Sequence, residues 1–165
     1  MNLRDIRENK DLADDDENLL EGIGYSSLFG TECSVYFNQD KIQINEAEMY
    51  IDQYINNLDQ EMIDRILHLA VEWKNQTVEE CPNVRYYAQG LQESTEKNII
   101  KYIHLNSIHI YRNPYDTEDP LLGASMYCVP NWDQDNHMEI IIKGKEVLEV
   151  REFLGYGEFA IWEDE

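Results

Sequence analysis

Residues 45–74, NEAEMYIDQYINNLDQEMIDRILHLAVEWK, are the longest periodic stretch of the chain. Apolar side chains recur there at steps of three and four residues, which is typical of one face of an amphipathic helix. Asn45, followed three residues later by a Glu, resembles a capping box, and Asn56-Asn57 offers a second helix start. We therefore favour one helix to about Leu58 and a second to about Lys74, although one long helix also fits the periodicity.

Shorter patterns on both sides of this stretch predict β-strands. Alternating or apolar runs predict strands at 25–29, 32–37, 41–44, 108–111, 121–129, 137–142, 146–151 and 158–162. Ser94 is expected to cap a third helix that includes Ile99, Ile100 and Ile103, and Lys143-Gly144-Lys145 has the composition of a tight hairpin turn. The predicted class is α+β, with a mostly antiparallel sheet and two to three helices packed on one face.

The length and composition indicate one folded domain. The chain has 165 residues, of which 42% are hydrophobic and 11% aromatic, too many for a disordered acidic tail. We divide it into an acidic N-terminal arm at 1–22 and a single α+β domain at 23–165. The arm contains the run Asp14-Asp15-Asp16-Glu17, and its few leucine and isoleucine residues could form a short docked helix.

The charge excludes several classes of partner. There are 34 acidic and 13 basic side chains, and the formal net charge is −21. Because binding to phosphate groups requires Lys and Arg, we expect no binding to nucleic acid or to anionic membranes. A macromolecular partner of this chain should be basic.

The N-terminal 25 residues lack the apolar core of a secretory signal, and no apolar run is long enough for a membrane span, so we expect a cytoplasmic protein. The three cysteines, Cys33, Cys81 and Cys128, are odd in number and contain no C-x-x-C pair. They are expected to be buried free thiols rather than disulfide or zinc ligands. The alternative is a nucleophilic Cys128 acting with His137.

Motifs for catalysis, cofactors or metals are missing from the sequence. There is no phosphate-binding loop, no dinucleotide fingerprint and no nucleophile elbow. Asn131, Asp133 and Asp135 match three positions of a calcium loop, but Asn136 and Ile142 stand where that loop needs Gly and Glu. We therefore expect no catalytic residues, no cofactor and no metal, and interpret 131–136 as a turn capped by its own polar side chains.

The acidic residues are unevenly distributed. Two segments, 113–139 and 152–165, contain 11 of them and no Lys or Arg, and they are interleaved with aromatic residues. Carboxylates beside Tyr and Trp would suit an interface with a basic protein, since charge speeds association and aromatics supply binding energy. The candidate contact residues are Asp116, Glu118, Asp119, Asp133, Asp135 and Glu158, with Trp132 and Tyr115 as possible anchors. The alternative is that the acidity serves solubility alone.

Three parts of the chain resemble a group of small bacterial proteins of unknown function. These parts are Leu28-Phe29-Gly30, the helical region after Asn45, and the stretch 131–145 with its NWDQDNH motif. Some members of that group are similar to immunity proteins of polymorphic-toxin systems. The resemblance, over about residues 25–155, implies an α+β fold and a non-catalytic role, although Met138 stands where the group has Gly.

The function expected from these observations is inhibition by occlusion. An acidic protein can cover the cationic surface of a nuclease-like toxin domain, as an immunity protein would. Two alternatives remain at this point. One is a housekeeping or regulatory protein-interaction module, and the other is a small metal-dependent hydrolase using Asp133, Asp135 and His137.

Overall fold

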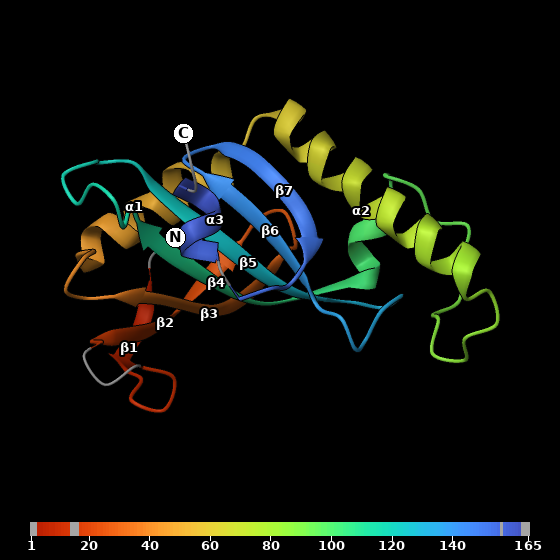
Figure 1. Ribbon diagram of the computed structural model, residues 1–165, viewed down its shortest axis with the longest axis horizontal. Helices are drawn as coiled ribbons and strands as arrows, with labels where there is room; N and C mark the ends of the chain where they lie inside the picture. Colours follow the sequence, from red (N-terminus) through yellow and green to blue (C-terminus); the bar gives the residue numbers. More distant parts are fainter. Residues whose placement is uncertain (1–2, 14–16, 156, 163–165) are drawn as a thin grey trace.

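The protein is described by a computed structural model that covers residues 3–13, 17–155 and 157–162. Within these residues, seven strands form one sheet in the order of the chain (Figure 1). The strands are β1 (Arg4–Glu8), β2 (Leu19–Ser26), β3 (Thr31–Asn38), β4 (Ile103–Arg112), β5 (Leu122–Pro130), β6 (Met138–Lys143) and β7 (Glu146–Glu152). All neighbouring pairs are antiparallel except β3 and β4, which are parallel. The predicted α+β class and mostly antiparallel sheet are confirmed.

The parallel pair explains where the helices lie in the chain, because parallel neighbours need a long crossover. This crossover contains α1 (Ile44–Gln53), the short 3₁₀ helix η1 (Ile55–Asn57), α2 (Gln60–Glu80) and a second 3₁₀ helix, η2 (Ile99–Tyr102). A last short helix, α3 (Gly157–Trp162), follows β7. Most of the helical residues are therefore inserted between two strands that pair directly.

The helical region breaks close to the predicted position, but Asp59 and not Asn56-Asn57 is the N-cap of the second helix, which runs to Glu80 rather than to about Lys74. The Asp59 side chain accepts a hydrogen bond from the Met62 N–H at 3.1 Å and so caps α2. The first helix starts two residues earlier than the Asn45 signal predicted, because the N-cap is Gln43 and Glu46 accepts from its N–H at 3.0 Å. Two helices, rather than one, follow from these caps.

The two faces of the sheet are covered differently. Val35 and Phe37 of β3 and Ile108 of β4 pack with Ala47 and Ile51 of α1 in the main core. On the opposite face, Ile161 and Trp162 of α3 pack against Ile141 of β6 in a smaller cluster. Figure 1 shows α1 and α3 on opposite sides of the sheet, with α2 extending past its β7 edge. The sequence predicted helices on one face of the sheet only, and the structure adds a helix, α3, on the other face.

The N-terminal arm is not a separate element. Arg4–Glu8 forms the edge strand β1, and β2 begins at Leu19, so both belong to the sheet instead of to a docked helix. The Arg7 guanidinium bonds to Glu21 of β2 at 2.6 Å, and Leu20 is buried in the main core. The charged residues of β1, Arg4, Asp5, Arg7 and Glu8, are those of an edge strand, where they oppose pairing with other chains. Asp14–Asp16 lie outside the described residues.

Other local predictions were wrong where short apolar runs gave no clear period. The predicted strand at 158–162 is helix α3, whose buried residues Gly157, Ile161 and Trp162 share one helical face. The predicted strand at 41–44 is a turn leading into α1, and the helix expected after Ser94 is reduced to η2, because Ile103 already belongs to β4. The Gly144 hairpin between β6 and β7 is confirmed, with the glycine at a φ of 60°.

Candidate functional site

The two acidic loops lie at opposite ends of the sheet. Arg112 pairs with Leu122 where β4 turns into β5, and Cys128 pairs with Met138 near the next turn, into β6. Since β5 runs between these turns over nine residues, they are separated by roughly 25 Å. We call them the α3 end (loop 113–121) and the Trp132 end (loop 131–137). The predicted contact residues therefore do not form one surface.

At the α3 end, the loop and helix α3 share an exposed aromatic pair. Tyr115 is 66% exposed and Phe159 49% exposed, and their ring centroids are 6.4 Å apart. Asp116 and Glu118 are exposed on the same loop, and Glu158, on α3, forms a 3.5 Å ion pair with Lys41. We call Tyr115, Asp116, Glu118, Glu158 and Phe159 the α3 surface. Phe159 was not among the predicted residues, although its neighbour Glu158 was.

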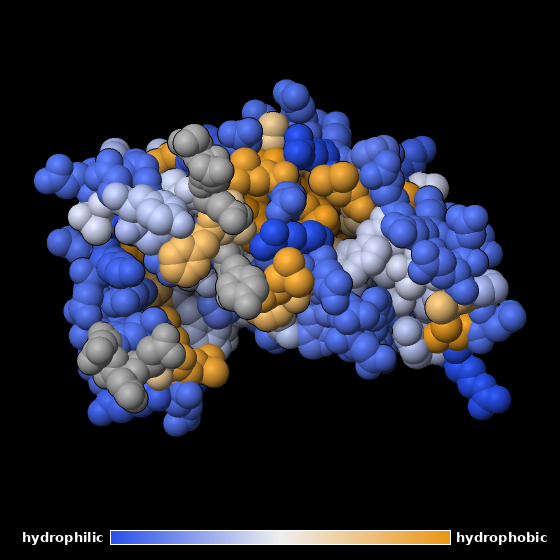
Figure 2. Space-filling view, viewed as in Figure 1, coloured by the Kyte–Doolittle hydropathy of each residue, from blue (hydrophilic) through white to orange (hydrophobic). Residues whose placement is uncertain are grey.

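More apolar surface continues on the same face. Phe153 and Leu154, on the segment that leads to α3, are 41% and 54% exposed. Figure 2 shows hydrophobic surface gathered in the middle of this face, over β6, β7 and α3, with hydrophilic surface around it. Exposed apolar surface with a polar rim is the usual composition of a protein–protein interface.

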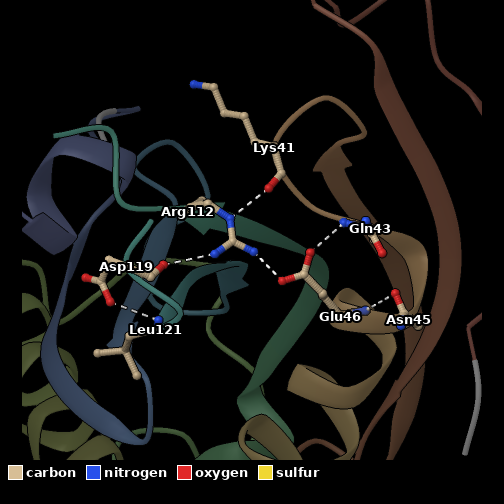
Figure 3. Close-up of polar contacts among 7 residues, drawn as sticks. All are labelled: Lys41, Gln43, Asn45, Glu46, Arg112, Asp119 and Leu121. Atoms are coloured by element: carbon tan, nitrogen blue, oxygen red, sulfur yellow. Dashed lines mark hydrogen bonds and ion pairs between the residues drawn. The ribbon is translucent and has the colours of Figure 1, made fainter. Parts of the chain in front are cut away.

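Arg112 holds the α3 end in place (Figure 3). Its side chain is only 10% exposed. The guanidinium donates to the carbonyl of Lys41 at 2.7 Å and to the carbonyl of Asp119 at 2.9 Å, and it forms an ion pair with Glu46 of α1. One cation thus joins the end of β4, the start of α1 and the acidic loop.

Asp119 belongs to this support rather than to the contact surface. Its carboxylate accepts from the Leu121 N–H at 3.0 Å and from the Asn113 amide at 3.1 Å. These hydrogen bonds, the one from Leu121 first, hold the pKa of Asp119 below its usual value. The carboxylate is already used to shape the loop, so we remove it from the candidate contacts.

At the Trp132 end, only part of the predicted set is accessible. Trp132 is fully buried and packs edge-to-face on Trp73 of α2, with centroids 5.9 Å apart, so its prediction as a surface anchor was wrong. Asp133 accepts from the Asn136 N–H at 2.9 Å, as expected for a self-capped turn. Asp135 is exposed.

His137 also has a local partner in this loop, because its Nδ1 lies against the Tyr127 hydroxyl. No group of three or more potential metal ligands occurs among residues 3–13, 17–155 and 157–162. The set Asp133, Asp135 and His137, which the hydrolase alternative requires, is therefore not assembled as a ligand group.

The cysteine prediction was correct for two of the three thiols. Cys33 and Cys128 are buried, and burial raises the pKa of Cys33 to about 12 and that of Cys128 further. A thiol of such high pKa is not a nucleophile at neutral pH, which argues against the Cys128–His137 alternative. Cys81 is exposed, after the end of α2.

A row of polar side chains on the α3 face was not found from the sequence. The Arg7 guanidinium donates to the Glu21 carboxylate. Hydrogen bonds from Tyr36 and Arg7 lower the pKa of Glu21. The Tyr36 ring in turn stacks on the His109 ring, with centroids 4.8 Å apart. Only the register of four strands brings these residues together, and each alone looks like an ordinary outward-facing position.

The row continues on the same face towards β7. Glu139 of β6 is fully buried, yet it accepts from the Ser125 hydroxyl at 3.1 Å and from Arg151 at 2.8 Å. The small pocket beside His109 has a volume of about 60 Å³, which leaves room for a few water molecules rather than for a substrate. We assign this row to the stability of the sheet.

The fold and surface define a small α+β domain with a single mostly antiparallel sheet and helices on both faces. The chain belongs to the family described as "Domain of unknown function (DUF6985)", whose sequence model matches residues 10–157. No curated protein and no solved structure gave a significant match. Among the described residues, no helix has both the length and the apolar character needed to cross a membrane.

Proposed function

We propose that this chain is a non-catalytic domain that binds a basic protein through the α3 surface and neutralises it by occlusion. In its most specific form, the proposal is that the domain is an immunity protein and the partner a nuclease-like toxin domain. The observation that carries it is the pair Tyr115 and Phe159, exposed side by side next to the carboxylates of Asp116 and Glu118.

Each part of this surface has a role in such a contact. The aromatic pair supplies area that loses little rotamer entropy when covered, and aromatic side chains are frequent hot spots. The carboxylates attract a cationic surface and make its association faster at low salt. The Arg112 contacts fix the loop before binding, which lowers the entropic cost of association.

The test is binding and protection with the proteins encoded by the adjoining genes. Each is purified and titrated with this protein, and toxic ones are co-expressed with it in cells. We expect one basic partner whose affinity falls at least tenfold between about 50 and 200 mM salt, through weaker steering and ion pairing. Co-expression should restore growth.

Two variants with a matched control locate the surface. Asp116→Lys with Glu118→Lys, and separately Phe159→Ala, should each weaken binding at least tenfold, the scale of a hot-spot contact. The control, Glu79→Lys with Glu93→Lys, makes the same charge change at two exposed sites away from the loop. Equal binding by the α3 variants and the control, or no salt-sensitive partner at all, would contradict the proposal.

A further inference from the structure

A second recessed site lies at the Trp132 end, away from the α3 surface. It has a volume of about 340 Å³ and lies between the C-terminal part of α2, the segment that follows it and the β5–β6 loop. Its lining includes four aromatic residues and two carboxylates, namely Trp73, Tyr86, Tyr87, Trp132, Glu80 and Asp133.

The aromatic rings form two perpendicular pairs. Trp73 meets Trp132 at an interplanar angle of 85°, and Tyr86 meets Tyr87 at 85° with centroids 5.6 Å apart. Tyr86 is 42% exposed, so this wall reaches the solvent while Trp132 closes the site from inside. A flat group entering from solvent would meet aromatic surface.

Hydrogen bonds between distant segments hold the walls in position. The Asn131 side chain accepts from the Ala88 N–H at 2.7 Å and donates to the Tyr86 carbonyl at 3.1 Å. The Tyr87 hydroxyl donates to the carbonyl of Cys81, at the end of α2, at 2.8 Å. The pocket is thus formed in the free protein and needs no partner to assemble it.

The electrostatics of the pocket favour a cation. Glu80 and Asp133 line it, and none of the lining residues is Lys, Arg or His. Asp133 already accepts from the backbone N–H and the side-chain amide of Asn136, so it contributes its negative charge to the pocket, while Glu80 is exposed. Burial raises the pKa of Tyr86, and the carboxylates of Asp133 and Asp135 raise it further, which places both charges close to this ring. Carboxylates beside aromatic faces stabilise a cation through ion pairing and cation–π attraction together.

We propose that this pocket binds the guanidinium group of an arginine residue in a protein partner. A guanidinium is planar, stacks on aromatic rings, donates in a fork to carboxylates and is less strongly hydrated than an ammonium, so it fits these walls better than a lysine does. The exposed wall at Tyr86 leaves room for the chain that carries the side chain to stay outside. This site is not part of the proposed function, and either proposal can be contradicted without the other.

The experiment is calorimetric titration of the full chain with a capped pentapeptide, Gly-Gly-Arg-Gly-Gly. The lysine analogue should bind about tenfold more weakly, because it lacks the fork and the planar face. The citrulline analogue, which keeps the shape and loses the charge, should show no measurable binding. Equal affinity for the arginine and citrulline peptides would overturn the proposal.

Variants place the binding in this pocket. Glu80→Gln with Asp133→Asn should reduce affinity for the arginine peptide about tenfold or more, and Tyr86→Ala should do the same. The Asp133→Asn replacement keeps an oxygen that can accept from the Asn136 N–H. A thermal melt of each variant checks that it folds. Glu79→Gln is the matched control beside the pocket, and unchanged affinity in the pocket variants would overturn the proposal.

Two further measurements distinguish a free small molecule from a protein side chain as the ligand, and distinguish this pocket from the α3 surface. If the small guanidinium compound agmatine binds as tightly as the peptide, the site takes a free small molecule and the assignment to a protein side chain is wrong. Asp116→Lys with Glu118→Lys at the α3 surface should leave peptide binding unchanged. Loss of function at one end is thereby distinguished from loss at the other.

Discussion

At the scale of single residues, the structure divides the charged side chains into those that build the protein and those that remain available. Asp119, Glu46 and Glu139 are all occupied by hydrogen bonds or ion pairs with other parts of the protein. Asp116, Glu118 and Asp135 are exposed, although one oxygen of Asp116 accepts from the Glu118 N–H at 3.1 Å. The number of acidic residues in a segment is therefore a poor guide to how many can meet a partner.

Replacing Arg112 with Met should destabilise the protein by about 3 kcal/mol, because Glu46 then loses its partner and two backbone carbonyls lose a donor. Chemical denaturation measures this loss. Arg4→Met is the control, since Arg4 and Glu32 form a well-exposed pair that should contribute no more than about 1 kcal/mol. Equal losses in the two variants would contradict the role given to Arg112.

His109 should make stability fall in mild acid. Burial lowers its pKa from 6.5 to about 4, so the unfolded chain binds the proton more readily than the folded one. The stability that neutral His109 contributes to the folded protein is therefore complete above pH 6.5. It is lost as the pH falls towards 4, by about 3 kcal/mol in total.

Urea denaturation between pH 7 and pH 4 measures this slope. His109→Gln should flatten it, while His104→Gln, at an exposed position of the same strand, should leave it as in the wild type. A slope that survives the His109 replacement would mean that carboxylates alone carry the acid sensitivity.

At the scale of elements, helix α3 is the part that connects the fold to the α3 surface. It packs on the sheet at Gly123, where a Cβ would lie 2.8 Å from the Ile161 side chain and 2.9 Å from the Ile142 carbonyl. The helix is too short to be stable alone, so its position depends on this contact.

We expect Gly123→Ala to displace α3 and to cost about 1–3 kcal/mol, the usual range for overpacking. Trp162, which is 5% exposed, should then show a red-shifted fluorescence maximum. Adding Ile161→Ala to that variant should recover part of the stability, because it removes the closest clash. Strictly additive losses would show that Ile161 is not what the new methyl group meets.

The elements also show where sequence patterns were informative. The long periodic stretch 45–74 was informative, since it holds two helices, and so were the strict alternation of Ile108 and Ile110 with His109 and Tyr111 and the turn residues around Gly144. Short apolar runs were not, because four or five residues fit a strand and a helical turn equally well. The segment 158–162 is such a case, since it forms helix α3.

At the scale of the whole molecule, the net charge of −21 should make stability depend on salt. Like charges repel one another in the compact state, and added ions screen that repulsion. Raising sodium chloride from about 0.01 M to about 0.5 M should raise the Tm by about 2–4 °C, equivalent to about 1 kcal/mol. Differential scanning calorimetry measures the shift.

A variant that reverses four exposed acids to Lys, at Glu79, Glu93, Asp116 and Glu118, is the control for this effect. Its net charge is closer to zero, so its Tm should respond less to salt. A Tm that falls with salt in the wild type would mean that attractive ion pairs outweigh the repulsion.

The sequence by itself determined the fold class, the helical middle of the chain and its acidic net charge, because these depend on local periods and on composition. Only the tertiary structure decided which carboxylates are accessible and which lie together. Each reversal of an antiparallel strand moves the next loop to the other end of the sheet, so loops 113–121 and 131–137 are close in sequence and far apart in space. For the same reason Trp132 packs inside against α2, while Tyr115 meets Phe159, 44 residues along the chain, at the surface.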